Sequence, residues 1–389
     1  MVTKKTSILL WAPLGSGTHY WGPGISAFNL LQGVDKEKYE IHLAHGFPAQ
    51  AKYPLFDSIS FVRKLIFKDK VSMTLFILWS YFWMKKNAKK YDICYNLSPH
   101  HIGLLPGVWF KKFGGKKTFV KMTALNDGFN DNSRVSKLLG LPQQRLRMAK
   151  EVDGFIALSS EIVEELKEKN IGAKQIIRIP NGVDTRKFVP LKLESKVLVR
   201  EKFGLKESDF VIVFTGGISQ RKGPSLVLRA IEGMIGRFPQ IQLLIIGPDR
   251  DKGKEKQVLE ELLSSNTVLQ NHTHIIDHTS TILAYYQAGD LFVLPSLNEG
   301  MSNSMLEAMS CGLPAIVTKV SGAADVVDHG RNGYLIDREV SQLAECILVY
   351  LENTELRTRH GIQARNKILA QFESNSVLKK HLELFRVDE

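Results

Sequence analysis

Short hydrophobic runs recur along the chain and alternate with longer segments in which apolar residues return every three or four positions. Runs rich in Val, Ile and Leu are typical of parallel strands that are covered on both faces. Such runs occur at 7–13, 39–46, 91–97, 117–123, 153–159, 174–180, 210–217, 241–248, 273–277, 291–296, 314–320 and 333–337. Their alternation with helical segments predicts an α/β protein built from doubly wound parallel sheets.

The strand series is interrupted near residues 186–197, where Pro190 lies in a polar stretch. A chain of 389 residues suits two domains at roughly 150 residues each. We therefore predict one domain over residues 1–190 and a second over 191–371. In doubly wound folds ligands bind beyond the carboxyl ends of the strands, in the crevice between domains. The loops that follow strands are thus the places to search for functional residues.

Composition narrows the class of protein. Hydrophobic residues make up 44% and charged residues 24%, which are ordinary values for a globular protein. The three cysteines are too few and too dispersed for a disulfide framework or a thiolate metal site. The first 20 residues do not resemble a signal peptide, so a cytoplasmic location is expected.

The net charge of +12 is unevenly distributed. Residues 1–190 hold 29 Lys and Arg against 15 Asp and Glu, and residues 191–389 hold 23 against 25. The basic excess therefore belongs to the first half. Such asymmetry indicates a face for nucleic acid or an anionic membrane, or simply a lysine-rich solvated surface.

Two loops after strands carry groups suited to phosphate. The first, 14–18, contains Gly15 and Gly17 and follows the first strand run. The second, 216–223, contains Gly217 and the adjacent cations Arg221 and Lys222. Arg can grip two phosphate oxygens at once, whereas Lys acts as a point charge. Neither loop is a Walker motif, and each taken alone is also compatible with a purely structural turn.

A third loop, 296–314, is more informative. Glu299 and Gly300 lie in its strand-to-helix turn, Ser302 or Asn303 can cap the helix that follows, and Glu307 lies within that helix. A ligand with hydroxyls at both ends and phosphate between them could contact both carboxylates and the helix N-terminus. A surface helix residue at 307 with a capping residue at 299 is the structural alternative.

These segments resemble retaining glycosyltransferase family 4, whose GT-B fold has two Rossmann-like domains. The family's Glu-x7-Glu signature corresponds to Glu299 and Glu307 in EGMSNSMLEAMSCGLPAIVT. IPNGVD at 179–184 with Phe188, the basic loop at 221–223, and the 321–335 segment resemble further family motifs. The resemblance is strong from about residue 154 onward and loose over 1–153. A C-terminal helix at about 372–389 is expected to pack back onto the first domain.

The resemblance implies transfer of a hexose from a nucleoside-diphosphate sugar with retention. Because Glu299 is expected to hold sugar hydroxyls, we expect same-face attack by the acceptor, and we expect no metal or other cofactor. Glu299 would bind donor-sugar hydroxyls, Glu307 would bind ribose hydroxyls, and Arg221 with Lys222 would stabilise the departing diphosphate. Further donor-binding groups would be Met301, Ser302 and Asn303, with Gly15, Gly17 and Gly217.

Two positions depart from the family pattern. The family often has an Arg five residues before the motif Lys, where this chain has Gly217. The family also commonly has a His after the fourth strand, whereas this chain has only Asp127 as a titratable group in that loop. Arg221 is therefore expected to carry more of the phosphate charge, and Asp127 is the candidate acceptor-side residue.

Residues 61–90 hold eight Lys and Arg, one Asp and an uncharged aromatic stretch from Val71 to Met84. Fourteen helical residues span about 21 Å, too short for the roughly 30 Å hydrocarbon core of a bilayer. The segment is expected to be a helix at an anionic membrane surface or a buried helix with basic ends. The first option suits a lipid-linked or cell-envelope glycan acceptor and a peripheral position on the inner face of the cell membrane.

Two other classes of protein are compatible with parts of the sequence. A GT-B-like nucleotide-sugar epimerase would bind a similar donor without transferring sugar. A nucleic-acid-binding protein would use the basic half, but no recognisable nucleic-acid motif accompanies that charge. We therefore expect no nucleic-acid partner.

Overall fold

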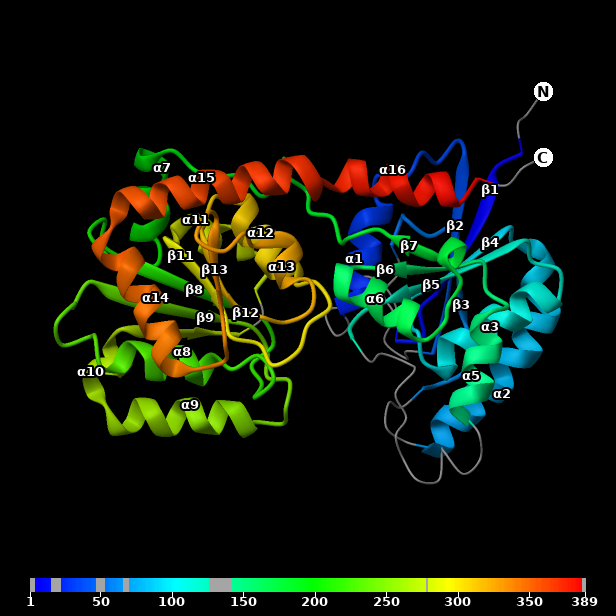
Figure 1. Ribbon diagram of the computed structural model, residues 1–389, viewed down its shortest axis with the longest axis horizontal. Coiled ribbons are helices and arrows are strands. Elements are labelled where there is room, and N and C mark those ends of the chain that lie inside the picture. The colour runs from blue at the N-terminus through cyan, green and yellow to red at the C-terminus, as the bar shows by residue number, and fades with distance from the viewer. Residues whose placement is uncertain are drawn as a thin grey trace. The chain divides into compact units, whose positions relative to one another are not determined.

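The computed structural model describes residues 4–14, 22–46, 53–65, 70–125, 141–277 and 279–386. It divides into two compact units, one formed by Met1–Gly182 with Ser374–Glu389 and the other by Val183–Glu373 (Figure 1). Each unit has a parallel sheet with helices on both faces. The α/β class with doubly wound parallel sheets, predicted from the hydrophobic runs, is confirmed.

The sheet of the first unit has the order β3-β2-β1-β4-β5-β6-β7. Its strands are β1 (Thr6–Trp11), β2 (Tyr39–His45), β3 (Ser58–Phe61), β4 (Ile93–Asn96), β5 (Lys117–Met122), β6 (Gly154–Ala157) and β7 (Ile176–Arg178). Its helices are α1 (Gly22–Leu31), α2 (Lys70–Asn87), η1 (Ala88–Lys90), α3 (His101–Lys112), α5 (Leu141–Ala149), α6 (Ser160–Glu168), η2 (Ala173–Gln175) and α16 (Ser374–Leu384).

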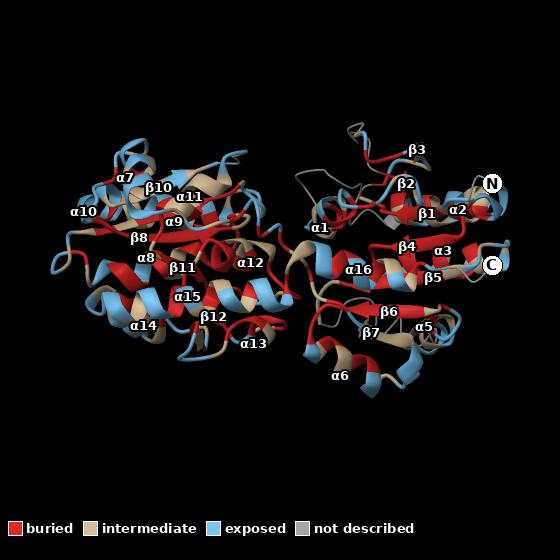
Figure 2. Ribbon diagram, turned by 90° about the horizontal axis from the view of Figure 1, so that it is seen from above, coloured by how far each residue is buried: buried red, intermediate tan, exposed pale blue. Residues whose placement is uncertain are grey.

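Strand β1 shows why these runs form central strands. Ile8 and Leu10 point into the cluster that contains residues of α1 and α16. Leu9 and Trp11 point to the opposite face, into the cluster that contains residues of α2 and α3. Side chains alternate between the faces of a strand, so an unbroken apolar run fits only a strand that is buried on both sides. Figure 2 shows this burial along β1, β4 and β6.

The sheet of the second unit has the order β10-β9-β8-β11-β12-β13. Its strands are β8 (Phe210–Thr215), β9 (Ile241–Ile246), β10 (Thr273–Ile276), β11 (Leu291–Leu294), β12 (Ala315–Thr318) and β13 (Gly333–Ile336). Its helices are α7 (Leu193–Glu201), α8 (Pro224–Glu232), α9 (Lys254–Ser265), α10 (Thr267–Asn271), α11 (Ile282–Ala288), α12 (Asn303–Ser310), α13 (Ala323–Val326), α14 (Val340–Glu352) and α15 (Thr354–Gln371).

Strand β3 is an element that the hydrophobic pattern does not predict. It pairs in parallel with β2 through four residue pairs, at the edge of the first sheet. Its sequence, Ser-Ile-Ser-Phe, is short and half polar, and none of its residues is fully buried. An edge strand needs less apolar surface than a central strand, so its sequence gives a weak signal.

Candidate active site

Two loops of the second unit meet where the strand order of its sheet reverses. Strands β8 and β11 are paired, although they are not consecutive in the sequence. The loop after β8 carries Arg221 and Lys222, and the loop after β11 carries Glu299. The N–H of Leu297 donates to the carbonyl of Arg221 at 2.7 Å, which ties the two loops together. Such a reversal is the usual place for a ligand in an open parallel sheet.

Glu299 is the centre of a charged trio in this place. Its Oε1 accepts from Lys222 Nζ at 2.5 Å and from Arg221 Nη1 at 3.0 Å. The Lys222 and Glu299 side chains are largely buried, whereas the Arg221 side chain is 52% exposed. Arg221 also donates to the carbonyl of Asn298 at 2.6 Å. Residues predicted from two separate loops therefore meet, with the two positive charges of Arg221 and Lys222 against the negative charge of Glu299.

The pKa values of the trio follow from burial and pairing. Burial alone would raise the pKa of Glu299, but the charges of Lys222 and Arg221 outweigh it and hold the pKa below its usual value. Burial lowers the pKa of Lys222, and the Glu299 carboxylate only partly opposes this. Glu299 is therefore ionised at neutral pH.

Glu307 lies in α12, which begins after the loop that carries Glu299. The Ser302 hydroxyl accepts from the N–H of Met305 at 3.4 Å and caps this helix. Glu307 Oε2 accepts from the Tyr286 hydroxyl at 3.0 Å. Burial raises the pKa of Glu307 to about 7, and the bond from Tyr286 opposes that rise. The two carboxylates of the motif are thus in different states, since Glu299 is fully ionised and Glu307 titrates near neutral pH.

The beginning of α12 is enclosed by protein. Met301 and Ser302 are buried, and the buried Oδ1 of Asn303 has no hydrogen-bond partner in the described part of the chain. An acceptor atom without a partner in a buried position carries a desolvation cost. Residues 301–303, which are predicted to bind the donor, come after β11 and therefore lie at the same end of the sheet as the charged trio.

The family model described as Glycosyl transferases group 1 matches residues 196–367. This match assigns residues 196–367, rather than the whole chain, to the family. The matched region contains the loops after β8 and β11, the charged trio and Glu307, and it lies wholly within the second unit.

Group 1 relatives with known names cover a similar part of the chain. D-inositol 3-phosphate glycosyltransferase of Corynebacterium jeikeium is 27% identical over 248 residues, which are 62% of this chain and 58% of the relative. UDP-Gal:alpha-D-GlcNAc-diphosphoundecaprenol alpha-1,3-galactosyltransferase of Escherichia coli is 30% identical over 251 residues, 63% of this chain and 62% of the relative. The chain thus matches roughly three-fifths of the length of each.

Similarity to solved structures extends over both units. Anabaena Alr3699/HepE, solved in complex with UDP, has a TM-score of 0.78 at 16% identity, covering 97% of this chain and 99% of that chain. Identity at this level shows the fold alone. The GT-B fold predicted from the sequence motifs is confirmed by this similarity.

Sequence reasoning does not find three residues that contact the candidate site: Thr215, Tyr286 and Arg338. The Tyr286 hydroxyl lies 2.8 Å from Thr215 Oγ1 and links it to Glu307. Arg338 donates from Nη2 to the carbonyl of Gln220 at 2.7 Å and from Nε to that of Pro295 at 2.9 Å. Arg338 thus binds both loops of the site. The only sequence signals are polar residues at strand ends, because Thr215 ends β8 and Arg338 follows β13.

Gly217 has a packing reason of its own. A Cβ at this position would lie 2.2 Å from Cγ of Arg250. Glycine therefore allows the loop after β8 to pass close to the Arg250 side chain. An Arg at this position, which the family pattern would place there, would not fit against Arg250 as it lies here.

The first unit contains a buried lysine that the motifs do not include. Lys121, in β5, is 2% exposed, and its Nζ donates to Asn181 Oδ1 at 3.0 Å and to Ser26 Oγ at 3.1 Å. No carboxylate lies within ion-pair distance of Lys121 among the described residues. Burial lowers the pKa of Lys121 to about 7.

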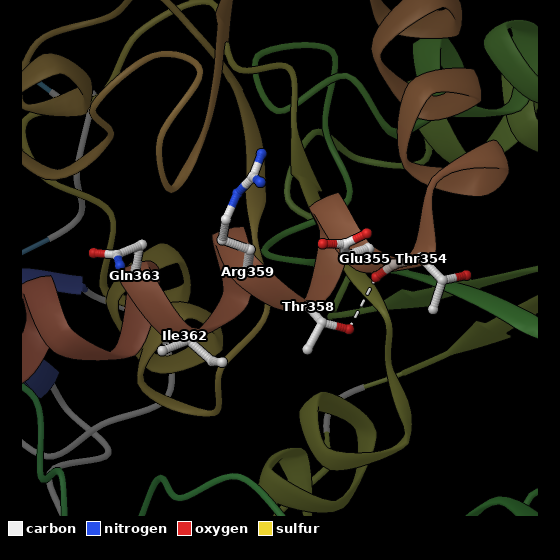
Figure 3. A pocket seen from close by; sticks show the side chains of 6 residues that line it. All are labelled: Thr354, Glu355, Thr358, Arg359, Ile362 and Gln363. Carbon is white, nitrogen blue, oxygen red and sulfur yellow. Dashed lines mark hydrogen bonds between the residues drawn. The ribbon is translucent and has the colours of Figure 1, made fainter.

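Three predicted residues, Gly15, Gly17 and Asp127, lie outside the described residues. A surface hollow lies on α15, in another part of the second unit (Figure 3). It is lined by a single helix, where Thr358 Oγ1 donates to the carbonyl of Thr354 at 2.9 Å. It holds none of the motif residues, so we do not place the site there.

Proposed function

We propose that the chain is a retaining glycosyltransferase that moves a hexose from a nucleoside-diphosphate sugar to an acceptor hydroxyl. The observation that carries this proposal is the contact of Arg221, Lys222 and Glu299 at the strand-order reversal, with Glu307 on the next helix. Cations there suit a diphosphate, and two carboxylates suit the hydroxyls on either side of it. Glu299 would bind the sugar and Glu307 the ribose.

Lys222 and Arg221 have the leaving-group role in this proposal. When the bond between sugar and phosphate breaks, negative charge develops on the diphosphate and positive charge on the sugar ring. Cations fixed in a partly dry site stabilise the leaving group without reorganising. Lys222 is already fixed by Glu299 and by burial. The helix N-terminus at residues 301–303 adds backbone N–H groups, whose partial positive charges also stabilise the leaving group.

Retention by same-face attack fits the position of Glu299 better than a double displacement does. A double displacement needs a carboxylate free to attack the anomeric carbon. The Oε1 atom of Glu299 is bound by two cations, which makes it a weaker nucleophile. We propose that the departing phosphate accepts the proton of the acceptor hydroxyl. Asp127 stays our candidate for a group on the acceptor side.

The acceptor is proposed to be a lipid-linked or cell-envelope glycan. The name of the Escherichia coli relative includes a diphosphoundecaprenol acceptor, and a Staphylococcus aureus relative is named for capsular polysaccharide biosynthesis. Within the described ranges, no helix has the length and hydropathy needed to cross a bilayer. We propose that contact with a lipid-linked acceptor is peripheral, at the inner face of the membrane.

A thermal unfolding screen with nucleotide sugars tests the proposed donor site. UDP-glucose, UDP-galactose and GDP-mannose are suitable probes, because relatives and structural neighbours are named with these nucleotides. A true donor at 100 times its Kd stabilises the folded protein by about 2.7 kcal/mol. The Glu307→Gln variant is expected to lose most of that shift. Absence of a shift with every nucleotide sugar and with free UDP and GDP would contradict the proposal.

Product analysis separates transfer from epimerisation. A transferase releases nucleoside diphosphate in proportion to a glycosylated acceptor, whereas an epimerase converts the sugar in the absence of any acceptor. The stereochemistry of the new bond, read by nuclear magnetic resonance, tests retention. Release of an inverted product would contradict same-face attack, while leaving the donor site intact.

A further inference from the structure

Helix α2 of the first unit exposes large apolar side chains. Leu78, Trp79 and Phe82 are 51%, 48% and 56% exposed. At 100° per residue these three positions lie within one side of the helix, so they form one continuous stripe. We call this stripe the α2 outer face. Contiguous exposed apolar groups on a folded protein usually mark a binding surface.

The opposite side of α2 already accounts for its place in the fold. Phe76 and Met84 are fully buried in the cluster that also contains Trp11. Ser80, between them, is buried and donates to the carbonyl of Phe76 at 2.7 Å. The helix is therefore held to the sheet by its inner side. In the part of the unit that the structure describes, Trp79 and Phe82 make ring contacts with Arg63 and Tyr81 and stay about half exposed.

Positively charged side chains lie at the C-terminal end of α2, next to the α2 outer face. Lys85 and Lys86 lie in its last turn, and Lys89 and Lys90 follow in η1, all four of them exposed. Residues 70–90 contain no Asp or Glu. At the other side of the stripe, the Arg63 guanidinium lies 5.5 Å from the centre of the Trp79 ring. The apolar stripe is therefore bordered by cations without a local acidic residue in its sequence.

We propose that the α2 outer face docks onto the surface of an anionic lipid bilayer. Leu78, Trp79 and Phe82 would enter the boundary between headgroups and acyl chains, and the lysines would reach lipid phosphates. In a contact with a second copy, residues 70–90 offer no acidic residue to pair with these lysines, whereas an anionic bilayer offers phosphates along its whole surface. This surface is separate from the charged trio and independent of the proposed transfer reaction.

Vesicle co-sedimentation with the intact protein tests this inference. Vesicles of phosphatidylcholine alone are compared with vesicles that contain one-third phosphatidylglycerol, at low and high salt. We expect binding to the anionic vesicles only, weakened by salt. The L78S/F82S variant is expected to partition into anionic vesicles at least tenfold less than the wild type. The K85E/K86E variant is expected to lose at least fivefold for each lysine that is reversed, because one basic residue near such a surface contributes about 1 kcal/mol.

Trp79 supplies a second readout, because its emission should shift to the blue when its ring enters the lipid. A Trp79→Phe variant should lack most of that shift. The matched control is L193S/L198S on α7, whose leucines are 64% and 59% exposed and lie in the other unit. Far-ultraviolet circular dichroism and thermal unfolding identify any variant that is misfolded.

Several outcomes would overturn the inference. They are equal binding to both vesicle types, unchanged binding of the α2 variants, and equal loss in the α7 control. A dimer in solution that L78S/F82S converts to a monomer would assign the surface to a second copy instead. Binding of the anionic vesicles does not require a nucleotide sugar, so failure here leaves the donor-site proposal untouched.

Discussion

Glu299 shares one carboxylate oxygen between two cations, which gives the site a net positive charge before any donor arrives. A diphosphate can then approach without first displacing a fully neutralised ion pair. Because Lys222 is buried beside Glu299, loss of either partner leaves a buried charge less compensated. Substitutions in the trio therefore act on stability as well as on transfer, and each needs its stability measured separately.

Lys222→Ala should lower kcat by about 10²–10³, which corresponds to a loss of about 2.7–4 kcal/mol in transition-state stabilisation. The physical reason is the loss of a fixed cation beside the departing phosphate. The measurement is kcat at saturating donor, with thermal unfolding to determine the folded fraction. Lys256→Ala, which removes an exposed lysine near Glu260, is the control. Turnover close to wild type would rule out the leaving-group role of Lys222.

Tyr286→Phe should raise the KM for the donor while changing kcat little. The hydroxyl of Tyr286 holds Glu307 and opposes the rise of its pKa, so its removal leaves Glu307 more protonated at neutral pH. In the wild type, the donor KM should rise as the pH falls through about 7, because a protonated carboxyl accepts fewer ribose hydroxyls. In the Tyr286→Phe variant, the pH at which this rise in KM is half complete should be higher.

Tyr285→Phe is the matched control for that experiment, because the neighbouring Tyr285 ring stacks on Phe203 and does not contact Glu307. Glu307→Gln should remove the pH dependence of KM altogether. An unchanged midpoint in Tyr286→Phe would show that the bond seen here does not influence donor binding.

At the scale of elements, one close approach controls the shape of the loop after β11. Gly322 precedes α13 with a φ of 74°. A Cβ there would lie 2.2 Å from the carbonyl oxygen of Gly300, which follows Glu299 in the motif. The loops after β11 and β12 thus touch through their backbones. This contact needs both a left-handed conformation and the absence of a side chain.

Gly322→Ala should cost about 1–2 kcal/mol for the left-handed backbone, plus a further loss from collision with Gly300. It should also weaken donor binding, because the Glu299 turn is displaced. Gly330→Ala is a close control, since Gly330 has the same φ of 74° but open space around its Cβ. Chemical unfolding and donor titration of both variants separate strain from collision. Equal losses of donor affinity in the Gly322→Ala and Gly330→Ala variants would show that collision with Gly300 does not displace the Glu299 turn.

Sequence reasoning succeeds best where residues are adjacent in the chain or buried on both sides. The central strands have unbroken apolar runs, and the loops with Arg221, Lys222 and Glu299 follow such runs directly. Strand β3 is missed because an edge position permits alternate serines. Tyr286 and Arg338 are missed because their partners lie 21 and 43 or more positions away, and spacing cannot reveal such contacts.

At the scale of the whole molecule, the two units can be followed separately. All five tryptophans of the chain lie at positions 11–109, in the first unit. Tryptophan fluorescence during unfolding by urea therefore reports the first unit only. Tryptophan fluorescence can therefore measure how the buried Lys121 affects the unfolding free energy of the first unit.

Lys121→Met should stabilise the first unit, with an effect that shrinks as the pH rises from about 7 to about 10. The pKa of folded Lys121 is lowered to about 7, so the unfolded chain binds more protons over this range. Wild-type stability relative to the variant should therefore rise by up to 1.4 kcal/mol per pH unit. The measurement is the unfolding free energy from tryptophan fluorescence. A difference independent of pH would contradict the lowered pKa.

The first unit is completed by α16, whose Val377 and Leu378 lie in the core beside β1 and α1, together with Phe385 directly after the helix. A ribosome synthesises this helix after the entire second unit. The part of the protein that is made first is therefore the last to gain its full core. Until α16 emerges, the apolar surface it covers stays open to chaperones and proteases. Emergence of α16 from the ribosome, rather than synthesis of the first 182 residues, sets the earliest moment at which that unit reaches its native stability.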